Sequence, residues 1–352
     1  MNFASDNTSG AHPKVLQALS QADAGSAMSY GHDPVTDRAQ ARLRAVFEHA
    51  HLLAYPVATG TATNALTLAC LTPPWGAVYC HRESHINTDE CGAPEMFADG
   101  AKLIPLAGEH GKLTPEAVEA ALADYTPGFV HAVQPHVLAL TQATEAGTVY
   151  TPDEVAALAR VAHAHGLKVQ MDGARFANAL VTLGCTPAEL TWKAGVDVLS
   201  FGATKNGALA AEAAVFFDPE LARGFEYRRK RAGHLFSKMR YISAQLEAYL
   251  ADDVWLLNAG HANDLARRLG DGLDALPGCA LVHPVQANEV FCELPVSVAD
   301  ALSAEGFTFY YWGGGDSGSA RVTARLVVSW NSEPGHVDAL LNAAGRHAAQ
   351  AA

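Results

Sequence analysis

Through the middle of the chain, short apolar runs rich in β-branched residues alternate with longer segments of helical periodicity. This alternation predicts an α/β fold with a mostly parallel sheet, because parallel strands are joined through crossover helices. The clearest helix start is at Thr151, which can cap the helix while Pro152 suits its first turn and Glu154 completes a capping box. We expect strands over Leu52–Pro56, Ala77–Cys80, Lys102–Pro105, Phe129–Gln134, Lys168–Met171, Val196–Phe201 and Ala213–Phe217, with helices over Asn64–Cys70, Pro115–Ala123, Pro152–His165 and Pro187–Ala194.

The pattern changes after residue 219, where two long helical stretches are followed by shorter strands and a final helix. This order predicts a second, smaller α+β domain. We therefore expect an N-terminal segment, residues 1–30, that packs on the small domain, a large domain over residues 31–250 and a small C-terminal domain over residues 251–352. The expected helices are Leu221–Leu250 (broken near Gly224 and Gly233), His261–Leu276 and one from His336. The expected strands are Leu281–His283, Glu289–Glu293, Phe307–Trp312 and Arg325–Trp330.

Net charge and cysteine content indicate which partners and which cellular compartment to expect. The formal net charge of −13 disfavours nucleic acid and anionic membrane as partners. No apolar run approaches the roughly 20 residues that a membrane span needs. The six cysteines are scattered without a C-x-x-C pair, which is typical of reduced thiols and indicates a cytoplasmic protein.

One lysine stands at an unusual place, just after the apolar run that ends at Phe201. Lys205 is flanked by Gly202, Thr204 and Gly207 and follows a strand that we expect to be buried. A lysine whose amine is desolvated can lose its proton and attack a carbonyl carbon. The alternative is an ordinary surface lysine in a loop, and this stretch alone does not decide between the two.

Other strand ends carry groups that suit a ligand, which in a parallel sheet binds beyond the carboxyl ends of the strands. After the first strand, Thr59, Gly60 and Thr61 open a helix, and backbone N–H groups at a helix N-terminus suit a phosphate. A plain threonine-capped turn is the alternative there. After Lys168–Met171 come Asp172, which must be paired if it is buried, and Arg175, which can bind a carboxylate through its fork. An internal salt bridge between these two side chains is the alternative.

A cluster of polar residues follows the second strand. His81, Glu83 and His85 suggest a metal-dependent hydrolase as a remote alternative, but the chain offers no P-C-x-x-C partner and the segment is expected to be a loop, so we expect no metal. His85 could instead lie against a planar ligand. A glycine-rich run from Gly313 to Gly318 formally fits a dinucleotide-binding pattern, yet it leads into a strand rather than a helix and is interpreted as a loop.

These features are more specific together than alone. A phosphate site, a histidine for a planar ring, an aspartate at one strand end and a lysine at the next are what pyridoxal 5′-phosphate requires, since it forms a Schiff base with lysine and needs an acidic partner for its ring nitrogen.

The same residues carry a family resemblance that extends over nearly the whole chain. It resembles the L-threonine aldolases of the β-eliminating lyase group, fold type I pyridoxal-phosphate enzymes, with the low-specificity bacterial branch most similar. The resemblance implies a large domain of the transferase-like fold type I. The motifs that carry it are Ala4-Ser5-Asp6-Asn7, Tyr30-Gly31-His32-Asp33, Thr59-Gly60-Thr61, His85–Glu95, Thr141–Thr148, Met171–Phe176, Ser200-Phe201-Gly202, Thr204–Gly207, Lys238-Met239-Arg240 and Arg325–Trp330.

The resemblance implies a role for each matching position. Lys205, His85 and Asp172 are the expected catalytic residues: Lys205 forms the Schiff base, His85 stacks on the ring and Asp172 pairs with the ring nitrogen. The expected cofactor-binding residues are Thr59, Gly60, Thr61, His85, Asp172, Arg175, Thr204 and Lys205. The expected ligands of the substrate carboxylate are Ser5, Arg175 and Arg325. Active sites at the interfaces of a homo-oligomer, a dimer or tetramer, are also implied.

The implied reaction is retro-aldol cleavage of L-threonine, L-allo-threonine and related L-β-hydroxy-α-amino acids to glycine and an aldehyde. Another pyridoxal-phosphate lyase reaction on the same scaffold, β-elimination or hydroxymethyl transfer, is the alternative. One position departs from the family: Thr144 stands where many members have a second active-site histidine, although His136 lies nearby in the sequence. The base for the substrate hydroxyl therefore stays open among His85, water and the cofactor phosphate.

Overall fold

A computed structural model describes residues 1–313 and 319–351 of the 352-residue chain. Its centre is a seven-stranded sheet with the order β1-β7-β6-β5-β4-β2-β3, in which only β7 runs against its neighbours. The prediction of an α/β fold with a mostly parallel sheet is thus confirmed. The strands are β1 (Leu53–Val57), β2 (Gly76–His81), β3 (Lys102–Leu106), β4 (Gln134–Thr141), β5 (Lys168–Gly173), β6 (Val198–Gly202) and β7 (Glu212–Phe216).

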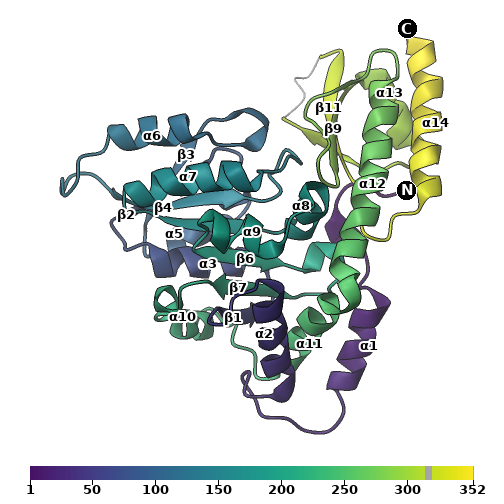
Figure 1. Ribbon diagram of the computed structural model, residues 1–352. Helices are drawn as coiled ribbons and strands as arrows, with labels where there is room; N and C mark the ends of the chain where they lie inside the picture. The colour runs from purple at the N-terminus through teal and green to yellow at the C-terminus, as the bar shows by residue number, and fades with distance from the viewer. Residues whose placement is uncertain (314–318, 352) are drawn as a thin grey trace.

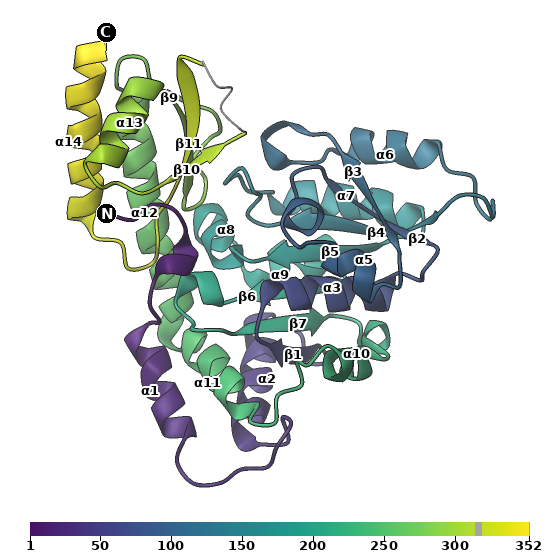
Figure 2. The same cartoon turned by 180° about the vertical axis from the view of Figure 1, so that it is seen from behind.

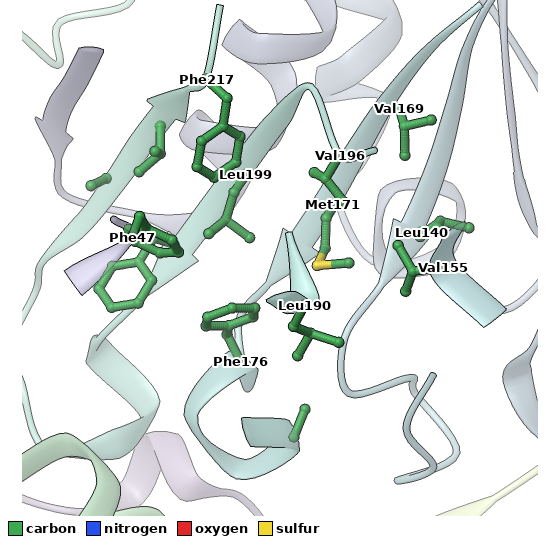
Figure 3. Packing of buried hydrophobic residues seen from close by; sticks show 14 of the residues in the cluster. Phe47, Leu140, Val155, Val169, Met171, Phe176, Leu190, Val196, Leu199 and Phe217 are labelled. Carbon is green, nitrogen blue, oxygen red and sulfur yellow. The ribbon is translucent and has the colours of Figure 1, made fainter. Parts of the chain in front are cut away.

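Helices cover both faces of this sheet, which explains why its central strands read as continuous apolar runs. Neighbouring residues in one strand face opposite sides: Val198 packs in the cluster under α3, whereas Leu199 packs with Phe47 and Phe217 on the other face (Figure 3). The helices around the large sheet are α2 (Pro34–Val46), α3 (Gly60–Leu71), α4 (His85–Thr88), α5 (Ala93–Phe97), α6 (Pro115–Ala123), α7 (Pro152–Ala164), α8 (Phe176–Leu183), α9 (Pro187–Leu190), α10 (Phe225–Arg231) and α11 (Arg240–Tyr249), with short 3₁₀ turns η2 (Glu109–Gly111), η3 (Trp192–Ala194), η4 (Thr204–Asn206), η5 (Pro219–Ala222) and η6 (Ala251–Asp253).

A second, antiparallel sheet with the order β10-β11-β9-β8 lies toward the C-terminus (Figures 1 and 2). Its apolar face packs against the long helix α12 and the two helices that follow. The smaller α+β unit is thus present, with β8 (Ala280–Leu281), β9 (Glu289–Pro295), β10 (Tyr310–Trp312), β11 (Arg321–Val327), α12 (Val254–Asp274), α13 (Val296–Ala304) and α14 (Pro334–Ala351). Of the glycine-rich run interpreted as a loop, only Gly313 lies within the described residues.

The N-terminal segment connects the two units. Phe3 donates its backbone N–H to Thr308 O at 2.7 Å and accepts from Val327 N at 2.8 Å, and its ring lies in the small-domain core. The chain then passes through the turn η1 (Asp6–Thr8) into α1 (Pro13–Ala22), which packs against α11 (Figure 2). Ser5 and Asp6 are thereby held between the two sheets.

One local expectation was wrong. The strand expected over Phe129–Gln134 begins only at Gln134, and the residues before it form turns in which Phe129 is 50% and Val130 is 90% exposed. The stretch Leu221–Leu250 is helical with the expected breaks near Gly224 and Gly233, which divide it into the end of η5, α10 and α11. Within the helical part of the described residues, no helix combines the length and apolarity needed to cross a bilayer.

Phe201 at the end of β6 is the side chain whose loss should weaken the large domain most clearly. It is fully buried, and its ring lies 5.8 Å from that of Trp255 and 5.9 Å from that of Phe47. Phe201→Ala should lower the free energy of unfolding by about 3–5 kcal/mol, because a large cavity replaces the ring. Phe129→Ala, at a half-exposed site, should stay within about 0.5 kcal/mol of the parent protein in the same denaturant titration. Equal losses in the two variants would contradict this view of the core.

Candidate active site

The expected site residues converge on one cavity of about 630 Å³ between the carboxyl ends of the large-sheet strands and the small sheet. This volume suits a cofactor with its substrate. Each residue proposed above from the sequence lines it: Ser5, Thr59, Gly60, Thr61, His85, Asp172, Arg175, Thr204, Lys205 and Arg325. These residues come from the N-terminal segment, from the strand ends, helices and turns of the large sheet, and from β11. Only folding of the chain brings them together.

Lys205 lies in the turn η4, in the connection that reverses the chain between β6 and β7. Gly207 makes this turn possible, since its φ of 114° disfavours any side chain and a Cβ there would lie 2.8 Å from Asn258 Nδ2. Asn206 anchors the turn by donating to Tyr249 Oη and Trp255 O, both at 2.8 Å. Among the described side chains, no carboxylate forms an ion pair with Lys205, and Lys205 lines the cavity.

Asp172 is the last residue but one of β5 and is 7% exposed. Asn64 donates to its Oδ2 at 2.7 Å, and the backbone N–H of Ala174 donates to its Oδ1 at 3.0 Å. The suggested internal salt bridge with Arg175 is absent from the described ion pairs, because Arg175 instead binds Asp6. A buried, oriented carboxylate is therefore presented to the cavity.

The N-terminus of α3 faces the same cavity. Thr59 caps the helix by accepting from Ala62 N at 3.2 Å, and within the described structure the backbone N–H groups of Gly60 and Thr61 have no hydrogen-bond partner. A Cβ placed on Gly60 would meet nothing within 4 Å, so the space above these donors is open. Free donors at the positive end of a helix dipole form an anion site.

His85 opens the short helix α4 and is fixed from two sides. Its Nδ1 lies 2.8 Å from Glu90 Oε1, and its backbone N–H donates to Glu145 Oε1 at 2.7 Å. The hydrogen bond to Glu90 raises the pKa of His85, with a smaller contribution from Asp172, although burial acts in the opposite direction. Because Nδ1 serves Glu90, Nε2 is the ring nitrogen left for a ligand.

The two arginines expected at the substrate carboxylate already have protein partners. Arg175 binds Asp6 through Nε at 2.8 Å and Nη2 at 3.1 Å, and its Nη1 lies 3.2 Å from Glu289. Arg325 binds Glu289 at 2.7 Å, and the ring of Trp312 lies 5.5 Å from its guanidinium. Arg325 also donates from Nη1 to Ala4 O at 3.4 Å. Glu289 thus positions both arginines at the cavity, and the Arg325 side chain is the more exposed of the two.

Several residues that line the cavity were not assigned a role from the sequence. Among them are four acids and one amide: Asn64, Glu90, Glu145, Glu212 and Glu289. Glu212 gave a usable signal, since it interrupts the small and apolar run from Ala208 to Phe217. Glu90 and Glu145 lie in loops, Asn64 lies on α3 and Glu289 opens β9, and the sequence pattern does not reveal that these side chains point into the cavity.

The remaining candidates lie elsewhere. His136 sits near the start of β4, with its Nδ1 2.8 Å from Gln134 O, and Thr144 is buried against Thr148 at 2.8 Å; neither lines the cavity. Both ring nitrogens of His81 contact backbone, at Gly108 O and Glu83 N. The geometry therefore does not favour the metal-dependent hydrolase.

A lysine beyond one strand, a buried aspartate at the next and a helix N-terminus ready for phosphate define this protein as a fold type I pyridoxal-phosphate enzyme. The residues fit the cofactor, because one cavity offers a lysine for its aldehyde carbon, a carboxylate for its ring nitrogen and free N–H groups for its phosphate.

Comparison with known proteins places the chain within that class. The model of the β-eliminating lyase family matches residues 2–296, and the chain belongs to this family. It is 46% identical over 332 residues to the low specificity L-threonine aldolase of Pseudomonas aeruginosa, covering 94% of this chain and 93% of the relative, and 45% identical to that of a Pseudomonas species, covering 95% and 94%. The structure of Leishmania major threonine aldolase superposes with a TM-score of 0.92 at 27% identity over 99% of each chain. Serine palmitoyltransferase from Sphingomonas wittichii, at 15% identity, a TM-score of 0.74 and coverage of 100% of this chain and 87% of its own, shares the fold.

Proposed function

We propose that this protein cleaves L-threonine, L-allo-threonine and related L-β-hydroxy-α-amino acids to glycine and an aldehyde, with pyridoxal phosphate as its cofactor. The observation that carries the proposal is the convergence of Lys205, Asp172, the α3 N-terminus and two arginines on one cavity. The two bacterial relatives named as low specificity L-threonine aldolases, similar over almost their whole length, support it.

The large-domain residues would hold the cofactor. When bound, pyridoxal phosphate supplies an aldehyde carbon for an amine and a ring that accepts electrons from the bond that breaks. Lys205 would provide the amine, Asp172 the negative charge at the ring nitrogen, and Gly60 and Thr61 the N–H donors for phosphate. His85 would lie against the ring. The Thr204 hydroxyl already bonds to Ala211, accepting from its N–H at 3.1 Å, so its contribution would be to shape the turn before Lys205.

The arginines and Ser5 would orient the substrate. Arg325, with the donors of Arg175 that Asp6 and Glu289 leave free, would bind the substrate carboxylate. The Ser5 oxygen accepts from Asn7 N at 3.1 Å, which leaves its hydroxyl proton to donate. A carboxylate fixed at these points holds the Cα–Cβ bond in one orientation, and binding geometry then selects which bond breaks.

We assign the base for the β-hydroxyl to His85. With Nδ1 donating to Glu90, the neutral imidazole carries its lone pair on Nε2, which can take the hydroxyl proton as the Cα–Cβ bond breaks and the aldehyde leaves. Protonation at Cα then gives glycine. Thr144 and His136 do not line the cavity, so neither replaces His85 in this role.

Glu90→Gln should lower the pKa of His85, because the largest cause that raises it is the hydrogen bond to the Glu90 carboxylate. Above the wild-type pKa, the His85 imidazole is neutral in both proteins. Below it, the wild-type ring becomes protonated first, while the ring of the variant stays neutral to lower pH. An NMR titration of the His85 ring protons measures this directly. Glu83→Gln, at an exposed glutamate two residues before His85, should leave the His85 titration unchanged. An unshifted His85 in the Glu90 variant would contradict the assigned contact.

A product assay tests the function. With L-threonine, retro-aldol cleavage gives glycine and acetaldehyde, whereas β-elimination on the same scaffold gives ammonia and a 2-oxo acid. We expect glycine and acetaldehyde in equal amounts, and benzaldehyde from L-phenylserine. Ammonia with 2-oxo acid and no glycine would replace the proposal with the elimination reaction.

We also propose that the protein works as a cytoplasmic homo-oligomer, a dimer or tetramer with active sites at its subunit interfaces. Exposed apolar side chains such as Tyr227, Leu257 and Met96 support association, and the six free cysteines suit a reducing compartment. The division into residues 1–30, 31–250 and 251–352 is likewise a proposal, supported by the two separate sheets.

A further inference from the structure

One buried amide joins two of the groups that the proposed function uses. Asn64 lies in the second turn of α3 and is 1% exposed. Its Nδ2 lies 2.7 Å from Asp172 Oδ2 and 2.9 Å from Glu90 Oε1. The same oxygen of Glu90 lies 2.8 Å from His85 Nδ1. A continuous series of hydrogen bonds therefore connects the carboxylate expected at the ring nitrogen with the histidine assigned as the base.

The neighbours of this amide determine which way it points. When ionised, Asp172 and Glu90 offer only acceptors, so Nδ2 rather than Oδ1 must face them. On the other side, Gln170 Nε2 donates to Asn64 Oδ1 and to Ser200 Oγ, both at 3.1 Å. A side-chain amide has two N–H donors, and here each carboxylate accepts one of them. Both donors of Asn64 thus serve protein groups.

The two carboxylates that share this amide lie close enough to repel each other. When two carboxylates share a site, one of them takes up a proton at a higher pH than usual. A hydrogen bond to the charged form of each acid opposes this uptake. Burial raises the pKa of Glu90 above its usual value and Asp172 adds to the rise, although hydrogen bonds from His85 and Asn64 act in the opposite direction.

Glu90 is the less satisfied of the two acids. Its Oε2 is buried and has no hydrogen-bond partner within the described structure, whereas the second oxygen of Asp172 accepts from Ala174 N at 3.0 Å. Without the donor from Asn64, Glu90 would therefore be the acid that takes up a proton. Glu90 and His85 would then hold one proton between Oε1 and Nδ1, and a second would occupy Nε2, where a base needs its lone pair.

We propose that Asn64 is a positioning residue that keeps Asp172 and Glu90 ionised side by side and thereby keeps the lone pair of His85 on Nε2. It acts through the two carboxylates, since both of its donors are bound to them. The inference deepens the proposed function and rests on it. It explains how one cavity maintains a negative charge at the ring nitrogen together with a base for the substrate hydroxyl.

An NMR titration of the full-length, cofactor-free chain tests this without any reaction. Asn64→Leu keeps a branched side chain and removes both donors. The pH at which His85 Nε2 loses its proton should rise by at least about one unit, because Glu90 and His85 then bind the extra proton more tightly. The other charged groups that face this pair are unchanged in the variant: Asp172 of β5, Lys205 of η4 and Glu145.

Thr67→Val is the matched control. Thr67 lies three residues further along α3, is fully buried and donates only to backbone carbonyls, those of Thr63 at 2.8 Å and Asn64 at 3.0 Å. The substitution removes a buried polar group from the same helix without removing a donor to either carboxylate. The His85 midpoint should therefore equal that of wild type. Equal rises in both variants would assign the effect to the packing of α3 and would overturn the inference.

A second measurement needs no variant to fold. In wild-type protein, the side-chain N–H of Asn64 that faces Glu90 should change its chemical shift with the same midpoint as His85 Nε2, because protonation changes the charge of the pair to which it donates. An Asn64 amide that does not respond at that pH would overturn the inference. So would an Asn64→Leu variant whose His85 midpoint is unchanged or lowered.

Activity provides a separate readout of the same network. The acid limb of kcat/KM for L-threonine reports the free enzyme, so in Asn64→Leu it should move to higher pH together with the His85 midpoint. An acid limb that stays in place while the midpoint moves would overturn the link to the base. A wild-type chain that releases no aldehyde would instead contradict the proposed function, and the NMR midpoints would still decide whether Asn64 controls the protonation of His85.

Discussion

Lys205→Ala is expected to abolish both the visible absorption of the cofactor-loaded protein and the release of aldehyde from L-threonine. Lys205 is the lysine that the structure places in the cavity, at the end of β6 and within the turn fixed by Asn206 and Gly207. Among the described residues that line the cavity, Lys205 is the one lysine, so without its amine no other lysine there can bind the cofactor covalently. Absorbance spectra and a coupled aldehyde assay measure the two losses.

Lys193→Ala is the control for this prediction. Lys193 lies on the surface beside Trp192 and pairs with Glu48 at 2.6 Å, away from the cavity. It should keep the absorption band and full activity. A Lys205 variant that retains both would remove the residue on which the proposed function depends.

Asp172→Ala should lower kcat by about 10²–10³-fold with a smaller effect on KM, a loss typical of removing one preorganised charge from a reacting centre. The charge of Asp172 matters most when electrons move into the ring, so binding should suffer less than turnover. Asp172→Asn keeps the shape but removes the charge. It should lose nearly as much kcat as the alanine variant, since charge rather than packing is the cause.

Steady-state kinetics on both variants, with thermal unfolding as a check on folding, measures this effect. Full activity in Asp172→Asn would show that a neutral hydrogen-bond partner is enough and would contradict the charged role. Loss of activity together with loss of the folded state would assign Asp172 to stability instead.

Much of the large sheet could be predicted from the sequence because its strands are buried on both faces and read as apolar runs. Lys102, Lys168 and the runs that follow them open strands at the expected positions, and α6 spans Pro115–Ala123 as expected. The failure at β4 has a physical cause. Phe129 and Val130 have high β propensity but lie after Pro127-Gly128, in turns exposed to solvent, whereas the true strand runs through Val137–Leu140.

The antiparallel direction of β7 could not be predicted from the sequence either, because hydrophobic periodicity does not reveal strand direction. The short connection through Lys205 and Gly207 reverses the chain and pairs Gly202 with Glu212. This pairing brings Glu212 to the turn that holds Lys205, where its Oε1 accepts from the Thr204 backbone N–H at 3.4 Å.

The candidate site could likewise be predicted only in part. Lys205, Asp172 and the Thr59–Thr61 turn were predictable because functional groups at the carboxyl ends of parallel strands meet at one edge of the sheet. The roles of Glu90 and Glu289 could not be predicted, because each residue acts on a neighbouring side chain. Glu90 holds His85, and Glu289 holds two arginines. Such supporting contacts appear only when side-chain positions are known.

The central claim is that Lys205 holds pyridoxal phosphate in this cavity, and one measurement tests it most directly. The purified protein is treated with borohydride, which reduces a Schiff base to a stable amine, and is then digested and mapped by mass spectrometry. We predict a phosphopyridoxyl group on the peptide that contains Lys205 and on no other lysine peptide. Attachment at a different lysine, or an unmodified Lys205 peptide in protein that shows the visible band, would contradict the account.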